Sequence, residues 1–211
     1  MAEFYNNNPN LKAAGVKINF TPEQIQEYIK CAQDPVYFIE NYCYIVSLDQ
    51  GLIKFNLYEC QKKKIDVIHN NRKVILMEGR QQGKTTTSAA YILWYTLFQD
   101  AKTVAILAHK ASAAREVLDR YQIMYESLPM WMQQGVVTWN KGDIELENRS
   151  KVFTAATTTS GIRGKTVNML YIDETAIIPN NIADAFFASV YPTISSGSDT
   201  KILLSSTPLG Y

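Results

Sequence analysis

The sequence predicts an α/β fold with one doubly wound, mainly parallel sheet, a small helical N-terminal subdomain and a hairpin on the sheet edge. Helical stretches at 84–99 and 110–128 alternate with strands, which indicates right-handed crossovers. The strands are short, nearly continuous apolar runs, typical of strands buried on both faces. They are KVILME (73–78), KTVAILAH (102–109), VNMLYIDE (167–174) and KILLSSTP (201–208).

The segment before the first of these strands is predicted to be helical. Thr21 and Gln24 have the spacing of a capping box that opens one helix, and Asp34 followed by Pro35 opens a second helix that we expect to run to residue 46. A third helix is expected over 57–70, with its lysines on the polar side. We divide the chain into a lid-like helical subdomain, residues 1–57, and a core, residues 58–211.

The sheet is expected to end in a hairpin. Residues 136–148, VVTWNKGDIELEN, contain two alternating stretches that turn at Lys141, Gly142 and Asp143. Residues 151–157 then predict one further strand. The hairpin would extend the parallel sheet on one edge.

Composition limits the class of protein. The 211 residues suffice for one α/β domain, and 46% hydrophobic content with a formal net charge of +1 argues against a tight, static nucleic-acid binder. The three cysteines are scattered and lack nearby histidines, so we expect buried thiols rather than a zinc site or disulfides. Since no export signal or long apolar run is present, we expect a cytoplasmic protein without a membrane span.

A phosphate-binding loop is predicted between the first strand and the helix that follows it. Residues 78–86 read EGRQQGKTT, and backbone N–H groups of such a turn and helix start converge on an anion. Lys84 would reach the β- and γ-phosphates and Thr85 would hold Mg²⁺. The alternative is a helix that merely begins with GKTTT. The nucleotide-binding residues expected in the loop are Gly79, Arg80, Gln81, Gln82, Gly83, Lys84, Thr85 and Thr86.

Two adjacent acids, Asp173 and Glu174, end a buried strand. Ligands of parallel sheets sit at the carboxyl ends of strands, so Asp173 can share a metal with Thr85 while Glu174 faces the attacking water. A general base beside the metal ligand favours hydrolysis over transfer to a small acceptor. The alternative is a solvated acid pair.

Two further predictions concern polar side chains near the phosphates. Ser205, Ser206 and Thr207 end the last strand; if that strand lies beside the other two, these hydroxyls come within reach of the γ-phosphate or Glu174, although they also suit a plain turn. Gln61 has an amide that suits an adenine edge, with a solvated helix glutamine as the alternative.

In order and spacing, these motifs resemble the ATPase domain of large terminase subunits of tailed bacteriophages, closest to the T-even type. The resemblance covers nearly the whole chain after about residue 35 and implies a RecA-like P-loop NTPase sheet of the ASCE type. The matching stretches are CQ (60–61), GRQQGKTT (79–86), ILAHKASAAREVLDR (106–120), WNKGDIELEN (139–148), GIRGKTV (161–167), LYIDETAIIP (170–179) and SSTPLG (205–210).

The resemblance implies a motor that packages double-stranded DNA. Large terminases hydrolyse ATP, with Mg²⁺, in a ring of five on the portal protein of an empty procapsid, together with a small terminase subunit. We therefore expect a host-cytoplasmic protein that is transiently on the portal and monomeric in isolation. The serine and threonine residues at 205–207 match the family's coupling motif, which links hydrolysis to movement.

The resemblance also assigns two arginines. Arg80 matches a family position proposed to contact the γ-phosphate within the same subunit, and its planar guanidinium suits charge neutralisation. It could instead pair with Glu78. Arg163 matches a position considered as an arginine finger that reaches the neighbouring subunit's ATP, and the alternative is a local ion pair.

The chain departs from the family pattern at two places. Glu78 stands where the general phosphate-loop pattern has its first glycine. The sequence also ends at Tyr211, just after the coupling motif, so we expect a fragment without the nuclease domain and without an acidic cluster for two nuclease metals.

Two other functions are compatible with these motifs. A superfamily-2 helicase-like ATPase and a non-hydrolysing, nucleotide-responsive assembly module are the alternatives. DNA contact by the lysines at 62–64 or by an exposed Trp131 is weakly indicated, since a lysine run is usually a solvated helix face. Four residues are interpreted as surface charges: Glu23, Arg115, Asp119 and Arg120.

Overall fold

In a computed structural model of the chain, helices and strands alternate as predicted. The structure describes residues 3–157, 162, 165–178, 184, 188, 197 and 199–208. The helices are η1 (Tyr5–Asn7), α1 (Pro22–Gln33), α2 (Pro35–Tyr42), α3 (Glu59–Asn70), α4 (Lys84–Phe98), α5 (Ala111–Glu126) and η2 (Thr175–Ile177). The strands are β1 (Tyr44–Ser47), β2 (Gly51–Lys54), β3 (Lys73–Met77), β4 (Thr103–Ala108), β5 (Val136–Trp139), β6 (Asp143–Leu146), β7 (Lys151–Ala156), β8 (Met169–Ile172) and β9 (Lys201–Ser206).

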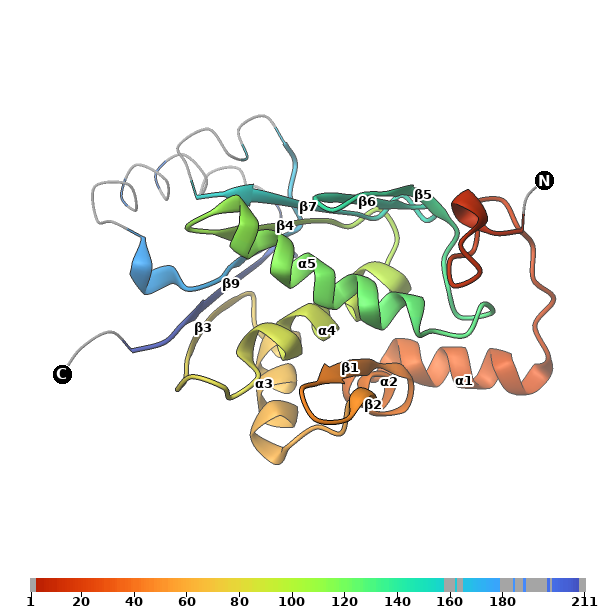
Figure 1. Cartoon of the computed structure of the whole chain (residues 1–211), viewed down its shortest axis with the longest axis horizontal. Coiled ribbons are helices and arrows are strands. Elements are labelled where there is room, and N and C mark those ends of the chain that lie inside the picture. The colour runs from red at the N-terminus through yellow and green to blue at the C-terminus, as the bar shows by residue number, and fades with distance from the viewer. Residues whose placement is uncertain are drawn as a thin grey trace.

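The main sheet has seven strands in the order β3-β9-β8-β4-β7-β6-β5. The first five strands in this order are parallel, and β6 and β5 continue the sheet as an antiparallel edge hairpin. The predicted α/β fold with its mainly parallel sheet and edge hairpin is therefore confirmed. Because β9 lies between β3 and β8, the ends of these three strands, which carry or directly precede predicted site residues, lie side by side (Figure 1).

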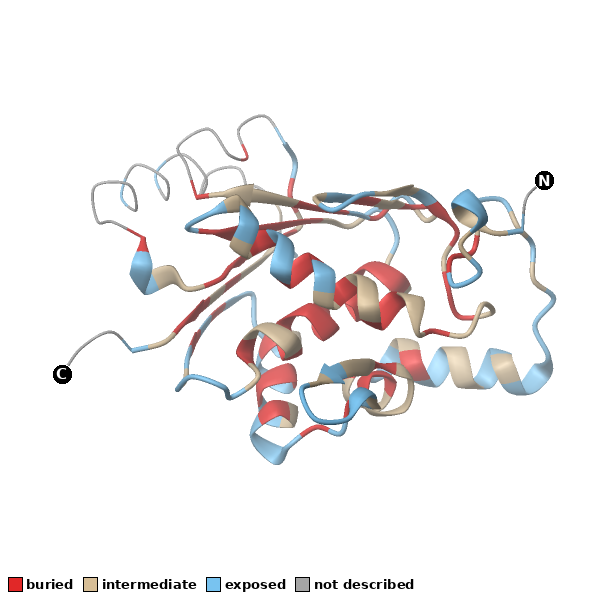
Figure 2. Cartoon of the chain, in the orientation of Figure 1, coloured by how far each residue is buried: buried red, intermediate tan, exposed pale blue. Residues whose placement is uncertain are grey.

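Both faces of the central strands are buried. On β4, Val104 and Ile106 belong to the large core on the side of α4 and α5, while Ala105 and Leu107 belong to a smaller cluster on the opposite face. Figure 1 shows α4 and α5 along one side of the sheet. Helix α4 is buried along most of its length (Figure 2), so the loop before it is anchored to a rigid element.

The strand β3 differs from its prediction. It was expected to be buried on both faces, but Ile75 and Met77 are 71% and 67% exposed, whereas Val74 and Leu76 are buried. Exposed and buried residues alternate along β3, so one face of this strand packs against the core and the described residues leave the other face open to solvent. An apolar run alone does not distinguish an edge strand from a central one.

The N-terminal helices begin as predicted. The Thr21 hydroxyl accepts from the Gln24 N–H at 3.3 Å, and the Gln24 side chain accepts from the Thr21 N–H at 3.0 Å. The carboxylate of Asp34 caps α2 by accepting from the N–H groups of Val36 and Tyr37. Both helix starts thus satisfy N–H groups that a helix leaves unpaired.

The second helix is shorter than predicted. It ends at Tyr42, and the residues after it form a hairpin of β1 and β2 instead of a helical turn. The run Tyr44, Ile45 and Val46 is aromatic and β-branched, which favours strand, and Gly51 supplies the positive φ of +71° at the turn. The N-terminal segment shares the large core of the sheet domain, through residues such as Phe38, Ile39 and Phe55.

Two of the three cysteines are buried, as predicted, but Cys60 is exposed at the start of α3. Burial raises the pKa of the Cys31 thiol to about 12, so this side chain is a neutral core residue. Within the described residues, no helix combines the length and apolar character needed to span a membrane.

Candidate functional site

The loop between β3 and α4 ends in a position that requires glycine. Gly83 is the N-cap of α4 with φ +73°, a backbone conformation that favours glycine. A Cβ at this position would lie 2.6 Å from Nε2 of Gln61, so space also requires glycine. The first N–H groups of α4 have no partner within the helix, which makes this helix start suited to an anion.

The Lys84 side chain is buried at the base of the loop and is 6% exposed. Its Nζ donates to the carbonyl oxygens of Glu78 (3.1 Å) and Gly79 (3.2 Å) and to Oγ1 of Thr207 (2.9 Å). The charge therefore lies inside the loop, and none of the described carboxylates forms an ion pair with it. A positive charge in this position attracts the phosphates of a bound nucleotide.

Thr85 and Asp173 meet as the sequence predicts. Oγ1 of Thr85 donates to Oδ2 of Asp173 at 3.0 Å. The other carboxylate oxygen accepts from Ser205 Oγ at 2.5 Å, Tyr171 OH at 2.9 Å and the Glu174 N–H at 3.1 Å. Hard oxygen ligands of this kind suit Mg²⁺, and one oxygen of the carboxylate is oriented by the protein.

Tyr171 supports this carboxylate from within the core. Burial raises the pKa of the Tyr171 phenol above its usual range, and the Asp173 charge raises it further. The phenol consequently stays protonated and donates its hydrogen to Asp173. Sequence reasoning missed Tyr171, although its place two residues before Asp173 on a strand puts both side chains on one face.

The three hydroxyls at the end of β9 contact three different parts of the site. Ser205 donates to Asp173, and Ser206 accepts from the Ala176 N–H at 3.0 Å in the turn after Glu174. Thr207 accepts from Lys84 and donates to Oε1 of Glu174 at 3.3 Å. They are therefore more than turn residues, because they connect the phosphate loop to both acids.

Gln61 of α3 forms a hydrogen bond to the backbone of the phosphate loop. It is 4% exposed; its Oε1 accepts from the Tyr58 N–H at 3.0 Å and its Nε2 donates to the Gln82 carbonyl at 3.3 Å. The alternative of a solvated helix glutamine is therefore wrong. In this arrangement the amide is engaged by the chain's own backbone, and an adenine contact stays a prediction.

A second residue of α3, Lys64, also contacts the phosphate loop, and we did not predict this contact from the sequence. Lys64 is buried in α3, and its Nζ lies 2.7 Å from Oε2 of Glu78. Since Glu78 pairs with Lys64, the alternative of an Arg80–Glu78 clamp is wrong. Arg80 is exposed and makes no ion pair with any residue that the structure describes. The spacing of Gln61 and Lys64 on one helix face was the available signal.

A cavity of about 310 Å³ opens over the loop. The cationic and hydroxyl groups of the loop line this cavity together with Glu174. A phosphate chain bound there would therefore contact the predicted residues at the same time. The cavity also includes Arg120 of α5, which the sequence analysis interpreted as a surface charge; the half-buried guanidinium corrects that interpretation. The lining residues are 80–86, Arg120, Glu174 and Thr207.

Comparison with known protein families shows to which family the chain belongs. The sequence model of the family described as terminase large subunit, T4-like virus type, N-terminal, matches residues 75–210. The chain belongs to this terminase large subunit family. Family membership decides against the helicase-like alternative.

Solved structures have the same fold as this terminase chain at low sequence identity. The large terminase of bacteriophage HK97 matches with TM-score 0.66 and 17% identity over 83% of this chain and 37% of that one. The large terminase ATPase domain of Thermus phage P74-26 matches with TM-score 0.55 and 19% identity over 74% and 67% of the two chains. This chain thus spans about 37% of the HK97 protein's length.

A third structure was solved with a nucleotide analogue. The large terminase of a thermophilic bacteriophage, in complex with ATP-gamma-S, matches with TM-score 0.55 and 15% identity. The match covers 74% of this chain and 39% of that one. At these identities the likeness shows the fold of the terminase chain.

Three further predictions for the terminase chain concern residues that do not line this cavity. Arg163 lies outside the described residues, so its role stays a prediction. The lysine run is not simply a solvated face, because Lys64 is buried and Lys62 pairs with Glu40 at 3.1 Å. Trp131 is half-buried and packs edge-on against Phe20 and Tyr42, which corrects the expectation that it is exposed.

No metal centre other than the Thr85 and Asp173 pair is indicated in the described part of the terminase chain. No group of three or more His, Cys, Asp or Glu side chains there is placed to hold a metal ion.

Proposed function

We propose that this domain binds ATP with Mg²⁺ and hydrolyses it to power the movement of double-stranded DNA into a procapsid. The observation that carries the proposal is the direct contact of Thr85 with Asp173 at 3.0 Å, beside a buried Lys84. Lys84 and Thr85 begin the helix α4 that follows β3, and Asp173 follows β8; only β9 lies between these two strands, and its hydroxyls connect the three residues to Glu174. The terminase family membership supports the same function.

In this proposal each residue has one chemical task. Lys84 binds the β- and γ-phosphates, while Thr85 and Asp173 hold Mg²⁺, which neutralises phosphate charge when bound. Glu174 accepts a proton from water as the water oxygen bonds to the γ-phosphorus and the bond to ADP breaks. The products are ADP and inorganic phosphate, and the proton returns to solvent.

Arg80 is proposed to neutralise charge on the leaving γ-phosphoryl group from within the same subunit. Its exposure and lack of an ion-pair partner in the described residues leave the guanidinium available for this contact. A complex with ADP and beryllium fluoride tests this. A distance beyond hydrogen-bond range between Arg80 and the fluoride would contradict the assignment.

The proposed partners follow from family membership. They are double-stranded DNA, the portal protein and the small terminase subunit, and the assembled form is a ring of five in the host cytoplasm, transiently on the portal. Ser205, Ser206 and Thr207 would couple hydrolysis to movement, because they contact the loop and both acids at once. Arg163 would reach the neighbouring subunit's nucleotide.

The catalytic assignment is tested by Glu174→Gln. We expect kcat for phosphate release to fall by at least about 100-fold, because a general base is lost, while ATP affinity changes little. Lys84→Ala should instead abolish ATP binding. Phosphate release and calorimetric titration measure the two effects, and Glu23→Gln, at an exposed position of α1, is the matched control.

The same variants separate an ATPase from a binding module. A nucleotide-responsive assembly module would bind ATP without turnover, so the wild type would release no phosphate beyond the Glu174→Gln level. Such a result would overturn the hydrolytic proposal and leave nucleotide binding in place.

A further inference from the structure

The Asp173 carboxylate is buried beside the phosphate loop without a counter-charge from the described residues. It is 8% exposed, and none of the ion pairs among those residues includes it. A buried carboxylate is costly unless hydrogen bonds or a cation stabilise it. Here neutral donors supply the hydrogen bonds, and they leave the negative charge available to a cation.

The neutral donors gather on one oxygen of this carboxylate. Oδ1 accepts from Ser205 Oγ at 2.5 Å, from Tyr171 OH at 2.9 Å and from the Glu174 N–H at 3.1 Å. Because a carboxylate oxygen has about two lone-pair directions, three donors saturate Oδ1. Among the described residues, Oδ2 accepts only from Thr85 Oγ1, at 3.0 Å.

The two hydroxyl donors belong to paired strands in the core. Tyr171 on β8 and Ser205 on β9 are both 0% exposed, and their hydroxyl oxygens lie 3.1 Å apart. The register of the two strands pairs Ile172 with Leu204, which places the next residues, Asp173 and Ser205, side by side. The orientation of the carboxylate is therefore set by the sheet.

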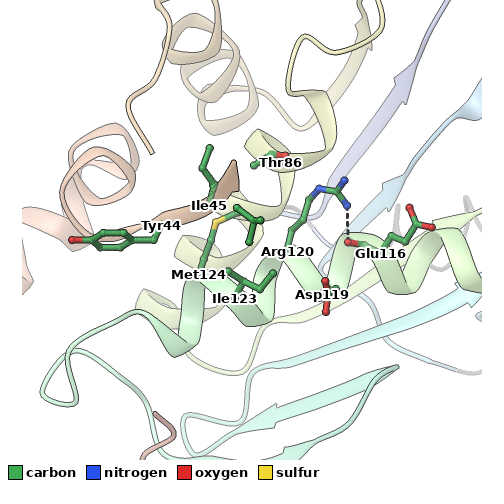
Figure 3. A pocket seen from close by; sticks show the side chains of 9 residues that line it. Tyr44, Ile45, Thr86, Glu116, Asp119, Arg120, Ile123 and Met124 are labelled. Carbon is green, nitrogen blue, oxygen red and sulfur yellow. Dashed lines mark hydrogen bonds between the residues drawn. The ribbon is translucent and has the colours of Figure 1, made fainter. Parts of the chain in front are cut away.

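Of the two neighbouring threonines at the start of α4, it is Thr85 that faces Asp173. Its hydroxyl donates to Oδ2, whereas Thr86 lines a cavity of about 400 Å³ together with Ile45 of β1 and Arg120 of α5 (Figure 3). The open side of the carboxylate thus meets one hydroxyl. Oδ2 and Oγ1 form a pair of hard oxygen atoms of the kind that Mg²⁺ prefers.

A carboxylate that offers a single oxygen favours a small cation. Mg²⁺ requires nearly octahedral geometry and usually keeps several of its waters, so one oxygen from each carboxylate suffices. Ca²⁺ takes roughly six to eight oxygen ligands and often binds a carboxylate through both oxygens. Binding through both oxygens of Asp173 would require Oδ1 to give up the hydrogen bonds from Tyr171 and Ser205.

We propose that the hydroxyls of Tyr171 and Ser205 position Asp173 so that it presents one oxygen to Mg²⁺, and that they thereby set the preference of the site for Mg²⁺ over Ca²⁺. Both are positioning residues, since they contact the carboxylate that serves the metal. The inference rests on the proposed nucleotide-binding function. It deepens that function by naming the residues that decide which cation accompanies the nucleotide.

The test measures how nucleotide binding depends on the metal ion, and it requires no turnover. Calorimetric titration with ATP-gamma-S is carried out at a series of Mg²⁺ or Ca²⁺ concentrations and in EDTA. Tyr171→Phe should raise the Mg²⁺ concentration for half-maximal binding about tenfold, because the carboxylate loses a donor that orients it. The corresponding Ca²⁺ concentration should rise by less than about threefold, and the affinity in EDTA should stay within about twofold.

Tyr121→Phe is the matched control. Tyr121 of α5 is also 0% exposed, and its hydroxyl lies 3.0 Å from Thr96 Oγ1, so the variant loses a buried hydrogen bond of the same kind outside the contacts of Asp173. Its stability should fall as that of Tyr171→Phe does, but both metal concentrations for half-maximal binding should stay within about twofold of the wild type.

The outcomes separate failure of the inference from failure of the proposed function. An unchanged Mg²⁺ requirement in a folded Tyr171→Phe variant overturns the inference, and so does an equal rise of the Mg²⁺ and Ca²⁺ requirements. If Tyr171→Phe does not fold, Ser205→Ala removes the other hydroxyl donor and decides the matter. If the wild type binds ATP-gamma-S neither with a metal ion nor in EDTA, or if Lys84→Ala binds it as tightly as the wild type, the proposed function itself is wrong.

Discussion

At the scale of single residues, Thr207 links two of the charged groups of the site, Lys84 and Glu174. Its hydroxyl accepts from Lys84 Nζ at 2.9 Å and donates to Glu174 Oε1 at 3.3 Å. The position of the glutamate is therefore linked to the position of the lysine through one neutral group. A phosphate that draws Lys84 away from this hydroxyl changes the hydrogen bond available to Glu174.

Thr207→Val tests this contact because valine has nearly the same shape but no hydroxyl. We expect kcat for ATP hydrolysis to fall about five- to tenfold, the equivalent of one lost hydrogen bond, with ATP affinity nearly unchanged. Thr207→Ser should restore most of the rate. Phosphate release measures the effect, with Thr138→Val on β5 as control. A Thr207→Val rate equal to that of the wild type would refute the coupling.

At the scale of elements, the phosphate loop is held by α3 as well as by its own strand and helix. Gln61 bonds the Gln82 carbonyl, and Lys64 pairs with Glu78 at 2.7 Å. Two residues one turn apart on α3 thus contact the two ends of the loop. This bracing explains why Glu78 is compatible with the site although the general loop pattern has glycine there.

Lys64→Met should destabilise the fold by breaking this pair. The Lys64 side chain is 4% exposed and that of Glu78 is 25% exposed, so water partly screens the remaining carboxylate. We therefore expect the free energy of unfolding to fall by about 1–2 kcal/mol, less than for a fully buried pair. Urea unfolding measures it, and Lys63→Met, at the exposed neighbouring position, is the matched control.

A double-mutant cycle distinguishes the pair from general packing. If Lys64→Met acts by leaving Glu78 unpaired, then adding Glu78→Gln should recover part of the lost stability. Strictly additive losses would show that the two side chains stabilise the fold independently and not through their ion pair.

At the scale of the whole molecule, residues 12–15, which precede α1, are attached to the edge of the sheet that β5 and β6 form. The Glu147 carboxylate accepts from the N–H groups of Gly15 (3.0 Å) and Gly135 (2.6 Å), and it pairs with Lys12 at 3.0 Å. Burial alone would raise the pKa of Glu147, but these hydrogen bonds and the lysine charge lower it from the ordinary value of 4.5.

This arrangement predicts an acid-dependent loss of stability. Because the pKa of Glu147 is lower in the folded state, its contribution is present above pH 4.5 and is lost as pH falls through the folded-state pKa. Glu147→Gln should thus be less stable than the wild type at pH 7, with a difference that shrinks in acid. Urea unfolding between pH 7 and 3 tests this, and a difference independent of pH would contradict it.

Local patterns in the sequence predicted the side chains of the candidate site and their place at strand ends. A lysine after glycine, an acid pair after a buried strand and hydroxyls at the end of another strand are local patterns, and parallel strands bring their carboxyl ends to one edge. Helix starts at Thr21 and Asp34 were readable for the same reason, since their capping partners lie within three residues.

Contacts between segments far apart in the chain could not be predicted from such patterns. Four features join segments far apart in the chain. They are the position of β9 between β3 and β8, the ion pair of Lys64 with Glu78, the place of Arg120 at the phosphate loop, and the hydrogen bond of Gly15 to Glu147. Local propensity and periodicity describe the residues along one element. Such contacts depend instead on how whole elements pack, which fixes the partners of side chains on their surfaces.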